Sequence, residues 1–123
     1  MNKKEQIIRR YFDSWITGEV SVLTETFAQN AVYVESYGPL YRGLDAIIKW
    51  FDNWNEHGSV LEWKILRFIH DGETVVCEWF FKCLYDDEKE EFNGVSLISF
   101  DSKNKITLLR EYQSKLPNYE PYR

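Results

Sequence analysis

The chain has 123 residues, a length that fits one domain. It is 44% hydrophobic and 17% aromatic, which supplies a packed core and excludes a disordered chain. Fifteen Lys and Arg against twenty Asp and Glu give a net charge of −5 without a basic stripe, so nucleic acid is not expected as a partner. No apolar run reaches the ~20 residues of a membrane span, so no membrane partner is expected either.

The cysteine and histidine residues favour a reduced protein without a metal or cofactor. Cys77 and Cys83 lie in one predicted strand, about 20 Å apart at ~3.3 Å per residue, which is too far for a disulfide. Two reduced thiols and an N-terminus without a signal peptide predict a cytoplasmic protein. Two cysteines and the distant His57 and His70 make no zinc pattern, and no phosphate-binding or dinucleotide-binding motif is present.

Two helices are predicted at the start of the chain. In Asn2–Thr17 the apolar residues recur at the i, i+3, i+4, i+7 spacing of one helical face, and Gly18 is placed to end that helix. A short helix follows with Ser21 as its N-cap, and it turns Leu23 and Phe27 inward.

A strand, a loop and a third helix come next. Ala31–Glu35 is predicted as a strand, and residues 37–43 as a loop. Leu44–His57 is predicted as a second amphipathic helix, with Gly58 directly after its end.

The rest of the chain changes to a period of two. Asp71-Gly72 marks a hairpin turn, and the acidic stretch Asp86–Glu91 is expected as a solvated turn. No parallel alternation of strands and helices occurs, so residues 1–123 are predicted to form one α+β domain, a curved antiparallel sheet wrapped around the N-terminal helices. Its last four strands are predicted at Val60–Ile69, Thr74–Tyr85, Phe92–Phe100 and Ile106–Lys115.

Five stretches, in order through nearly the whole chain, carry a resemblance to a known family. Their combination resembles the nuclear transport factor 2-like superfamily and, within it, the SnoaL-like group of polyketide cyclases and ketosteroid isomerases. The resemblance implies a cone-shaped fold with an apolar pocket between the concave face of the sheet and the helices. The stretches are YFDSWITGE (11–19), FAQNAVYVE (27–35), YRGLDAI (41–47), GVSLISF (94–100) and ITLLREY (106–112).

A homodimer through the outer face of the sheet is also expected, because such dimers are common in the family. The sequence agrees independently. Both alternating sets of residues in the last strands are apolar, for example Val95 and Leu97 against Ile98 and Phe100. A strand that is apolar on both sides is covered on both sides, and a partner subunit would supply the second cover.

The resemblance implies three candidate catalytic residues. Glu35, three residues before Gly38, is similar in position to the base of ketosteroid isomerases, and Tyr11 to their oxyanion-stabilising tyrosine. Glu111 resembles the general-base Asp of the SnoaL cyclase. A carboxylate on an aromatic wall has a raised pKa, which suits base chemistry. The alternatives are an exposed Glu35, a Tyr11 that belongs to the core, and a Glu111 without activity.

The expected substrate-binding residues are mostly aromatic. Tyr33 shares a strand face with Glu35, and Gln113 shares one with Glu111. Ser96 stands where ketosteroid isomerases place a protonated Asp; this departure argues against ketosteroid isomerase activity. Four tryptophans are expected as flat walls for a ligand, with core and interface packing as the alternative: Trp15, Trp54, Trp63 and Trp79.

These features predict a protein that binds a small hydrophobic or partly polar metabolite. Catalysis would be cofactor-independent proton transfer, as in an isomerase, a cyclase or a dehydratase. One alternative is a non-catalytic ligand-binding module with the same pocket. Another is an interaction protein, in which side chains fill the cone and the sheet face is the functional surface.

Overall fold

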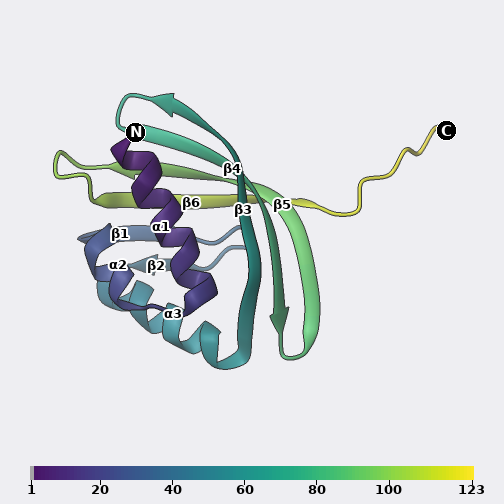
Figure 1. Ribbon diagram of the computed structural model, residues 1–123, viewed down its shortest axis with the longest axis horizontal. Coiled ribbons are helices and arrows are strands. Elements are labelled where there is room, and N and C mark those ends of the chain that lie inside the picture. Colours follow the sequence, from purple (N-terminus) through teal and green to yellow (C-terminus); the bar gives the residue numbers. More distant parts are fainter. Residues whose placement is uncertain (1) are drawn as a thin grey trace.

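Three helices pack against one side of a curved six-stranded sheet in the computed structural model, which describes residues 2–123 (Figure 1). Helix α1 spans Lys3–Thr17, α2 spans Ser21–Thr26 and α3 spans Leu44–His57. The side chain of Asn2 caps α1, and Gly18 ends it in the left-handed conformation, with a φ of 78°. The predictions of the two longer helices are therefore confirmed.

The sheet has the order β2-β1-β6-β5-β4-β3. Every neighbouring pair is antiparallel except β1 and β6, which run parallel. The predicted α+β cone is confirmed, but the parallel pair was not predicted. The strands are β1 (Phe27–Val34), β2 (Leu40–Arg42), β3 (Gly58–Asp71), β4 (Thr74–Tyr85), β5 (Glu88–Phe100) and β6 (Ile106–Lys115).

The short second helix and the first strand differ from the prediction. Val20 occupies the N-cap position of α2 without a side-chain hydrogen bond, so Ser21 is a helical residue and not the cap. Phe27 is buried as predicted, but it opens β1 instead of belonging to the helix. Pairing of Phe27 with Ile106 of β6 explains this difference, because the sheet extends β1 four residues earlier than the expected start at Ala31.

Two segments predicted as irregular are partly strand. The loop 37–43 contains β2, whose Tyr41 pairs with Tyr33 of β1. In the acidic stretch only Asp86 and Asp87 form the turn, with φ of 49° and 67°. Such a two-residue left-handed turn matches the twist of a hairpin, so β5 already begins at Glu88.

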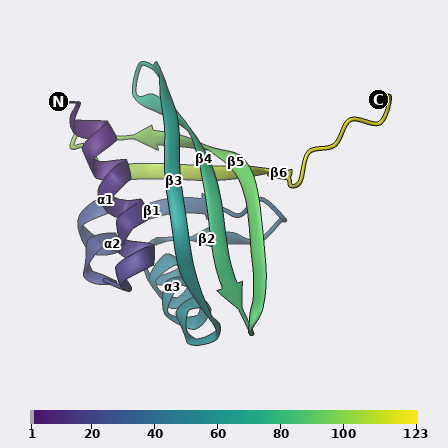
Figure 2. The ribbon, with the colours of Figure 1, turned by 45° about the vertical axis from the view of Figure 1, so that its right-hand side comes forward.

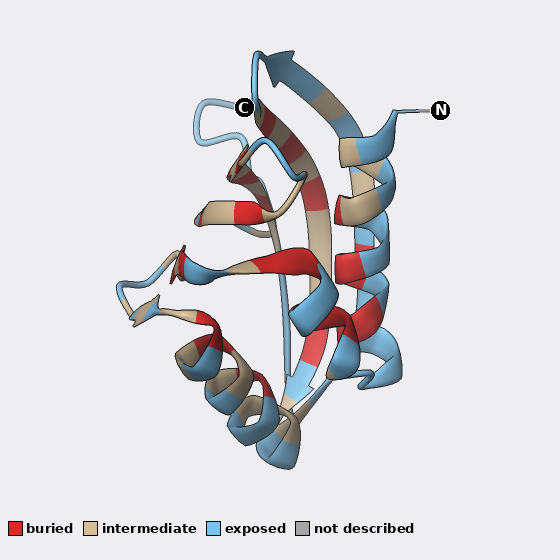
Figure 3. Ribbon diagram, turned by 90° about the vertical axis from the view of Figure 1, so that its left-hand side faces the viewer, coloured by how far each residue is buried: buried red, intermediate tan, exposed pale blue. Residues whose placement is uncertain are grey.

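The central strands alternate between a buried inner face and a partly exposed outer face. In β4 the side chains of Val75, Cys77 and Trp79 are buried, whereas Val76 and Phe80 are half-buried. The bands of colour along the central strands in Figure 3 follow this period of two. The inner face packs on the apolar side of α1 and forms the core.

The sheet curves so that its strands enclose a space together with the helices. Helix α1 lies across the concave face, and α3 lies near the end where β3, β4 and β5 bend over (Figures 1 and 2). Residues after β6 run away from the body of the molecule (Figure 1). Within residues 2–123, no helix is long and apolar enough to cross a membrane.

Candidate functional site

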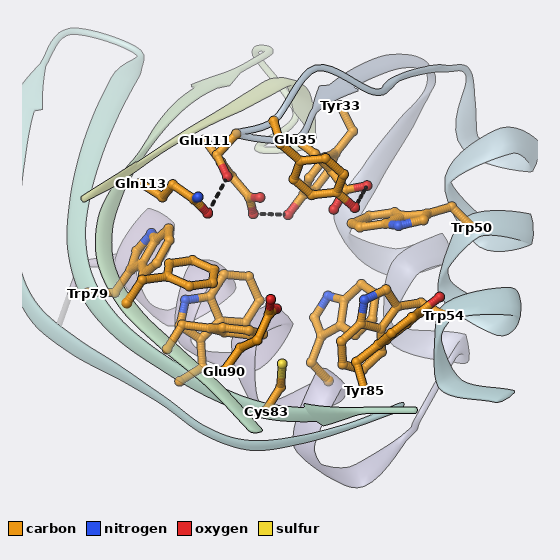
Figure 4. A pocket seen from close by; sticks show the side chains of 16 residues that line it. Tyr33, Glu35, Trp50, Trp54, Trp79, Cys83, Tyr85, Glu90, Glu111 and Gln113 are labelled. Carbon is orange, nitrogen blue, oxygen red and sulfur yellow. Dashed lines mark hydrogen bonds between the residues drawn. The ribbon is translucent and has the colours of Figure 1, made fainter. Parts of the chain in front are cut away.

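A cavity of about 450 Å³ opens inside the cone (Figure 4). Its lining comes from α1, α3, the end of β1 with the residues that follow it, and strands β3 to β6. The volume lies in the range of small-molecule sites, roughly 300–1,000 Å³. The aromatic side chains therefore line the cone and do not fill it.

Most of the side chains predicted for the site meet in this cavity. Tyr11 and Ser96 are the exceptions, because both are buried behind the wall. Ser96 Oγ accepts a hydrogen bond from Trp79 Nε1 at 2.9 Å and so supports a wall residue. The predicted residues that line the cavity are Trp15, Tyr33, Glu35, Trp54, Trp63, Trp79, Glu111 and Gln113.

A chain of hydrogen bonds ends on Glu111. Trp15 Nε1 donates to the Tyr11 hydroxyl at 2.9 Å, and that hydroxyl donates to the Tyr33 hydroxyl at 3.0 Å. The Tyr33 hydroxyl in turn donates to Glu111 Oε2. Each donor points toward the carboxylate, so Tyr11 reaches the cavity only through Tyr33. We call this series the tyrosine chain.

The environment of Glu111 favours its protonated form. Burial raises the pKa of Glu111 to about 8, and the nearby Glu35 carboxylate contributes in the same direction. The hydrogen bond from Tyr33 opposes the shift, because it stabilises the charged form. Burial likewise raises the pKa of Tyr33 and of Tyr11 well above the usual value, so both hydroxyls stay protonated as donors.

Glu35 lies directly after β1 and is only 8% exposed. Its Oε1 accepts hydrogen bonds from the Tyr41 hydroxyl at 2.6 Å and from the Tyr37 hydroxyl at 3.1 Å. Burial raises the pKa of Glu35, and the two tyrosine hydroxyls limit the rise. The β1–β2 hairpin thus holds this second carboxylate in place, since Tyr41 lies in β2 and Tyr37 in the connection.

Eight of the sixteen lining residues were not among the predicted site residues, and Trp50 and Glu90 are two of them. Trp50 of α3 lines the cavity and stacks on Tyr41, with ring centroids 4.7 Å apart. It shares the apolar stripe of its helix with Trp54, and this pattern in the sequence already indicated that Trp50 faces inward. Glu90 lines the cavity as well. Counting back by two from Phe92 places Glu90 on the inner face, but only once β5 is known to include it.

The cavity wall has an unusual composition. Of its sixteen lining residues ten are aromatic, and they include all five tryptophans of the chain. Three are glutamates, and within residues 2–123 no Lys, Arg, His, Leu, Ile, Val or Met lines the wall. Trp63 Nε1 is buried without a hydrogen-bond partner in the described part of the chain. No group of three His, Cys, Asp or Glu in residues 2–123 is placed to hold a metal ion.

A curved α+β cone is the architecture of the nuclear transport factor 2-like class. Within that class, the chain belongs to the SnoaL-like domain family, whose model matches residues 8–109. Glu111 and Gln113 lie just beyond the matched range. A search of curated proteins finds no match to the chain.

Solved structures show the same fold at low sequence identity. A protein of ketosteroid isomerase-like fold from Catenulispora acidiphila, in complex with trimethylamine, has a TM-score of 0.78 at 19% identity, over 88% of this chain and 85% of its own. An LEH-like epoxide hydrolase from M. tuberculosis has a TM-score of 0.79 at 17% identity, over 89% and 76%. An NTF2-like protein from Burkholderia pseudomallei has 0.78 at 14%, over 93% and 92%. These identities establish the fold alone.

Proposed function

We propose that this protein binds a small organic molecule in the cavity and transfers a proton to or from it with Glu111, without a cofactor. The observation that carries the proposal is the position of Glu111, whose carboxyl group faces an aromatic cavity while Tyr33 holds one of its oxygens. A general acid or base works best with a pKa near the working pH, and that of Glu111 is about 8.

Each polar group has a distinct role in this proposal. Glu111 removes a proton in its charged form and returns it in its neutral form. The Tyr33 hydroxyl, which lines the cavity, takes the donor role expected for Tyr11 and stabilises negative charge on the substrate. Tyr11 becomes a positioning residue that orients Tyr33 through the tyrosine chain. Such groups suit an isomerisation, a cyclisation or a dehydration.

The structural neighbours give this proposal a limited kind of support. One of them is an epoxide hydrolase and another was solved with trimethylamine, so proteins of this fold accommodate small molecules. A non-catalytic binding module is the second candidate. It is favoured by the hydrogen bonds that both carboxylates already accept from tyrosine hydroxyls, which fix Glu35 and Glu111 in a resting arrangement.

We further propose that the protein forms a homodimer through the outer face of the sheet and that it is located in the cytoplasm. The outer face supports the first part, because Val76, Phe80, Val95 and Leu97 remain half-buried in a single chain. The two cysteines support the second part, since both are free and buried and such thiols are typical of a reducing compartment.

A model base reaction tests the catalytic proposal without knowledge of the natural substrate. The probe is nitrobenzisoxazole: a base removes its ring C–H proton, the N–O bond breaks, and a coloured cyanophenolate forms. We expect the protein to accelerate this opening by about 10²-fold or more over free carboxylate in buffer. The rate should rise with pH to a plateau above about 8, where Glu111 is charged.

Two variants decide the outcome. Glu111→Gln should reduce the rate to the buffer background, because the amide cannot accept the proton. The control is Glu78→Gln, because Glu78 does not line the cavity. Its Oε1 accepts a hydrogen bond from Arg67 Nε at 2.9 Å. If the rate of Glu111→Gln equals that of the unmodified protein, the catalytic role is wrong. Binding of the probe without turnover would favour the non-catalytic module.

A further inference from the structure

The ionisable carboxyl groups that line the cavity have no basic side chain of the described residues beside them. Glu35, Glu90 and Glu111 line it, whereas none of the fifteen Lys and Arg or the two His does so within residues 2–123. An anionic ligand would find no cationic side chain from this part of the chain there, although a buried charge needs an opposite partner. The net charge of −5 adds a long-range preference for cations.

The apolar part of the wall is aromatic and contains no aliphatic side chain among the described residues. All five tryptophans contribute to it, and their arrangement is not a simple stack. Trp15 and Trp54 meet edge to face with ring centroids 5.4 Å apart, and Trp15 and Trp50 are tilted at 5.0 Å. Tryptophan presents the most negative ring face of any side chain, so it is the best partner for a cation.

The carboxylates lie on two sides of this aromatic enclosure. Glu111 and Glu35 lie on one wall of the cavity, and Glu90 lies on the wall across from them (Figure 4). Trp50, Trp54 and Tyr85 lie at one end between these walls. A ligand in the middle of the cavity would therefore have aromatic side chains and carboxyl groups on several sides at once.

We propose that the cavity is a cage for a small organic cation with an alkylated ammonium group. The aromatic rings replace the weak hydration of its methyl groups, and the glutamates balance its charge. This inference rests on the proposed small-molecule site and assigns its ligand class.

A pair of probes of the same shape isolates the charge. One is choline, and the other is the neutral alcohol in which a tert-butyl group replaces the trimethylammonium group. Titration calorimetry should show choline binding at least about tenfold more tightly than the alcohol. Equal or tighter binding of the alcohol, or no binding of choline, overturns the inference. If the benzisoxazole reaction still depends on Glu111 in that case, the proposed function stands and only the ligand class is wrong.

Variants at the wall test the source of the preference. Trp50→Leu keeps an apolar side chain and removes the ring, so choline affinity should fall about tenfold while alcohol affinity stays within twofold. An equal loss of affinity for both probes would mean that the ring contributes only apolar surface, and this result would overturn the cage. Glu90→Gln changes an exposed residue and leaves the fold undisturbed; it should weaken choline alone. Tyr112→Leu, on the outer face, is the matched control for the loss of a ring.

Discussion

Glu111 is the residue where opposite physical effects meet. Burial disfavours its charge, Glu35 adds repulsion, and the Tyr33 hydroxyl partly offsets both. The result is a carboxyl group that changes its protonation state near neutral pH, although a glutamate in water does so near pH 4.5. Two consequences at the residue scale follow, one for stability and one for the rate of proton transfer.

The stability of the protein should fall as the pH rises from about 5 to about 8. In this window the folded protein keeps a proton on Glu111 that the unfolded chain has released, because the pKa is about 8 when folded and 4.5 otherwise. The free energy of unfolding then decreases by up to about 1.4 kcal/mol per pH unit and levels off above the folded pKa. Glu35, with its pKa raised too, contributes in the same direction.

Calorimetric melting between pH 5 and 9 measures this effect. Glu111→Gln should flatten most of the slope, whereas Glu78→Gln should keep it. An identical pH profile for Glu111→Gln and the unmodified protein would mean that Glu111 titrates normally.

Tyr33→Phe should raise the pKa of Glu111 further, since it removes the hydrogen bond that stabilises the carboxylate. In the benzisoxazole reaction, the midpoint of the pH–rate profile would move to higher pH. The control is Tyr112→Phe on the outer face of the sheet. A midpoint that stays in place or moves down would show that the tyrosine chain does not act on this carboxyl group.

At the scale of elements, Gly94 in β5 leaves space for the large ring of Trp79 in the neighbouring strand β4. It pairs with Trp79 of β4, and a Cβ at this position would lie 2.4 Å from the ring of Trp79 and 2.5 Å from the carbonyl oxygen of Tyr112. Neither a buried ring nor a backbone oxygen in the neighbouring strand moves easily. The glycine is therefore required by the close approach of its neighbours.

We expect Gly94→Ala to destabilise the protein by about 1–3 kcal/mol, the usual effect of overpacking. Denaturant unfolding at constant pH measures the loss. Asn93→Ala, one residue earlier and half-exposed, should change stability by less than about 0.5 kcal/mol. If both variants unfold at the same denaturant concentration, the ring of Trp79 is not confined as described.

The elements with a strong internal period could be predicted from the sequence. Helices α1 and α3 have an apolar stripe and a glycine after the last turn, and the central strands alternate clearly. Where the boundary depends on a partner, local patterns were insufficient. Strand β2 exists because Leu40–Arg42 pairs with β1, and the start of β5 depends on a turn in which two aspartates adopt a left-handed conformation.

The same distinction explains the site. Glu35, Tyr33 and Glu111 could be proposed because strand alternation and the family resemblance place them on an inner face. The apolar stripe of α3 was a local signal for Trp50, but its stacking on Tyr41 depends on how α3 packs against the β1–β2 hairpin, which is a long-range arrangement. Tyr11 was placed correctly on the buried face of α1, but it does not line the cavity and is connected to it only by its hydrogen bond to Tyr33.

At the scale of the whole molecule, the outer face of the sheet carries apolar side chains that are only half-buried. A second copy on this face would cover the apolar residues Val95 and Leu97. Analytical ultracentrifugation should therefore show a dimer, and Leu97→Lys should weaken it by about tenfold or more, because it would bury an unpaired charge. Ile16→Lys changes an equally apolar but exposed residue of α1 and should leave the dimer intact. A monomer at all concentrations would refute this assembly.

The placement of every tryptophan in one wall has an optical consequence. The chain has five indole rings, and all of them border the same cavity, so its ultraviolet emission carries no contribution from tryptophans elsewhere. Any molecule that enters alters the polarity around these fluorophores, and the titrating carboxyl group of Glu111 lines the same cavity. The intrinsic tryptophan fluorescence should therefore report both the occupancy of the cavity and the protonation of Glu111 without an added label.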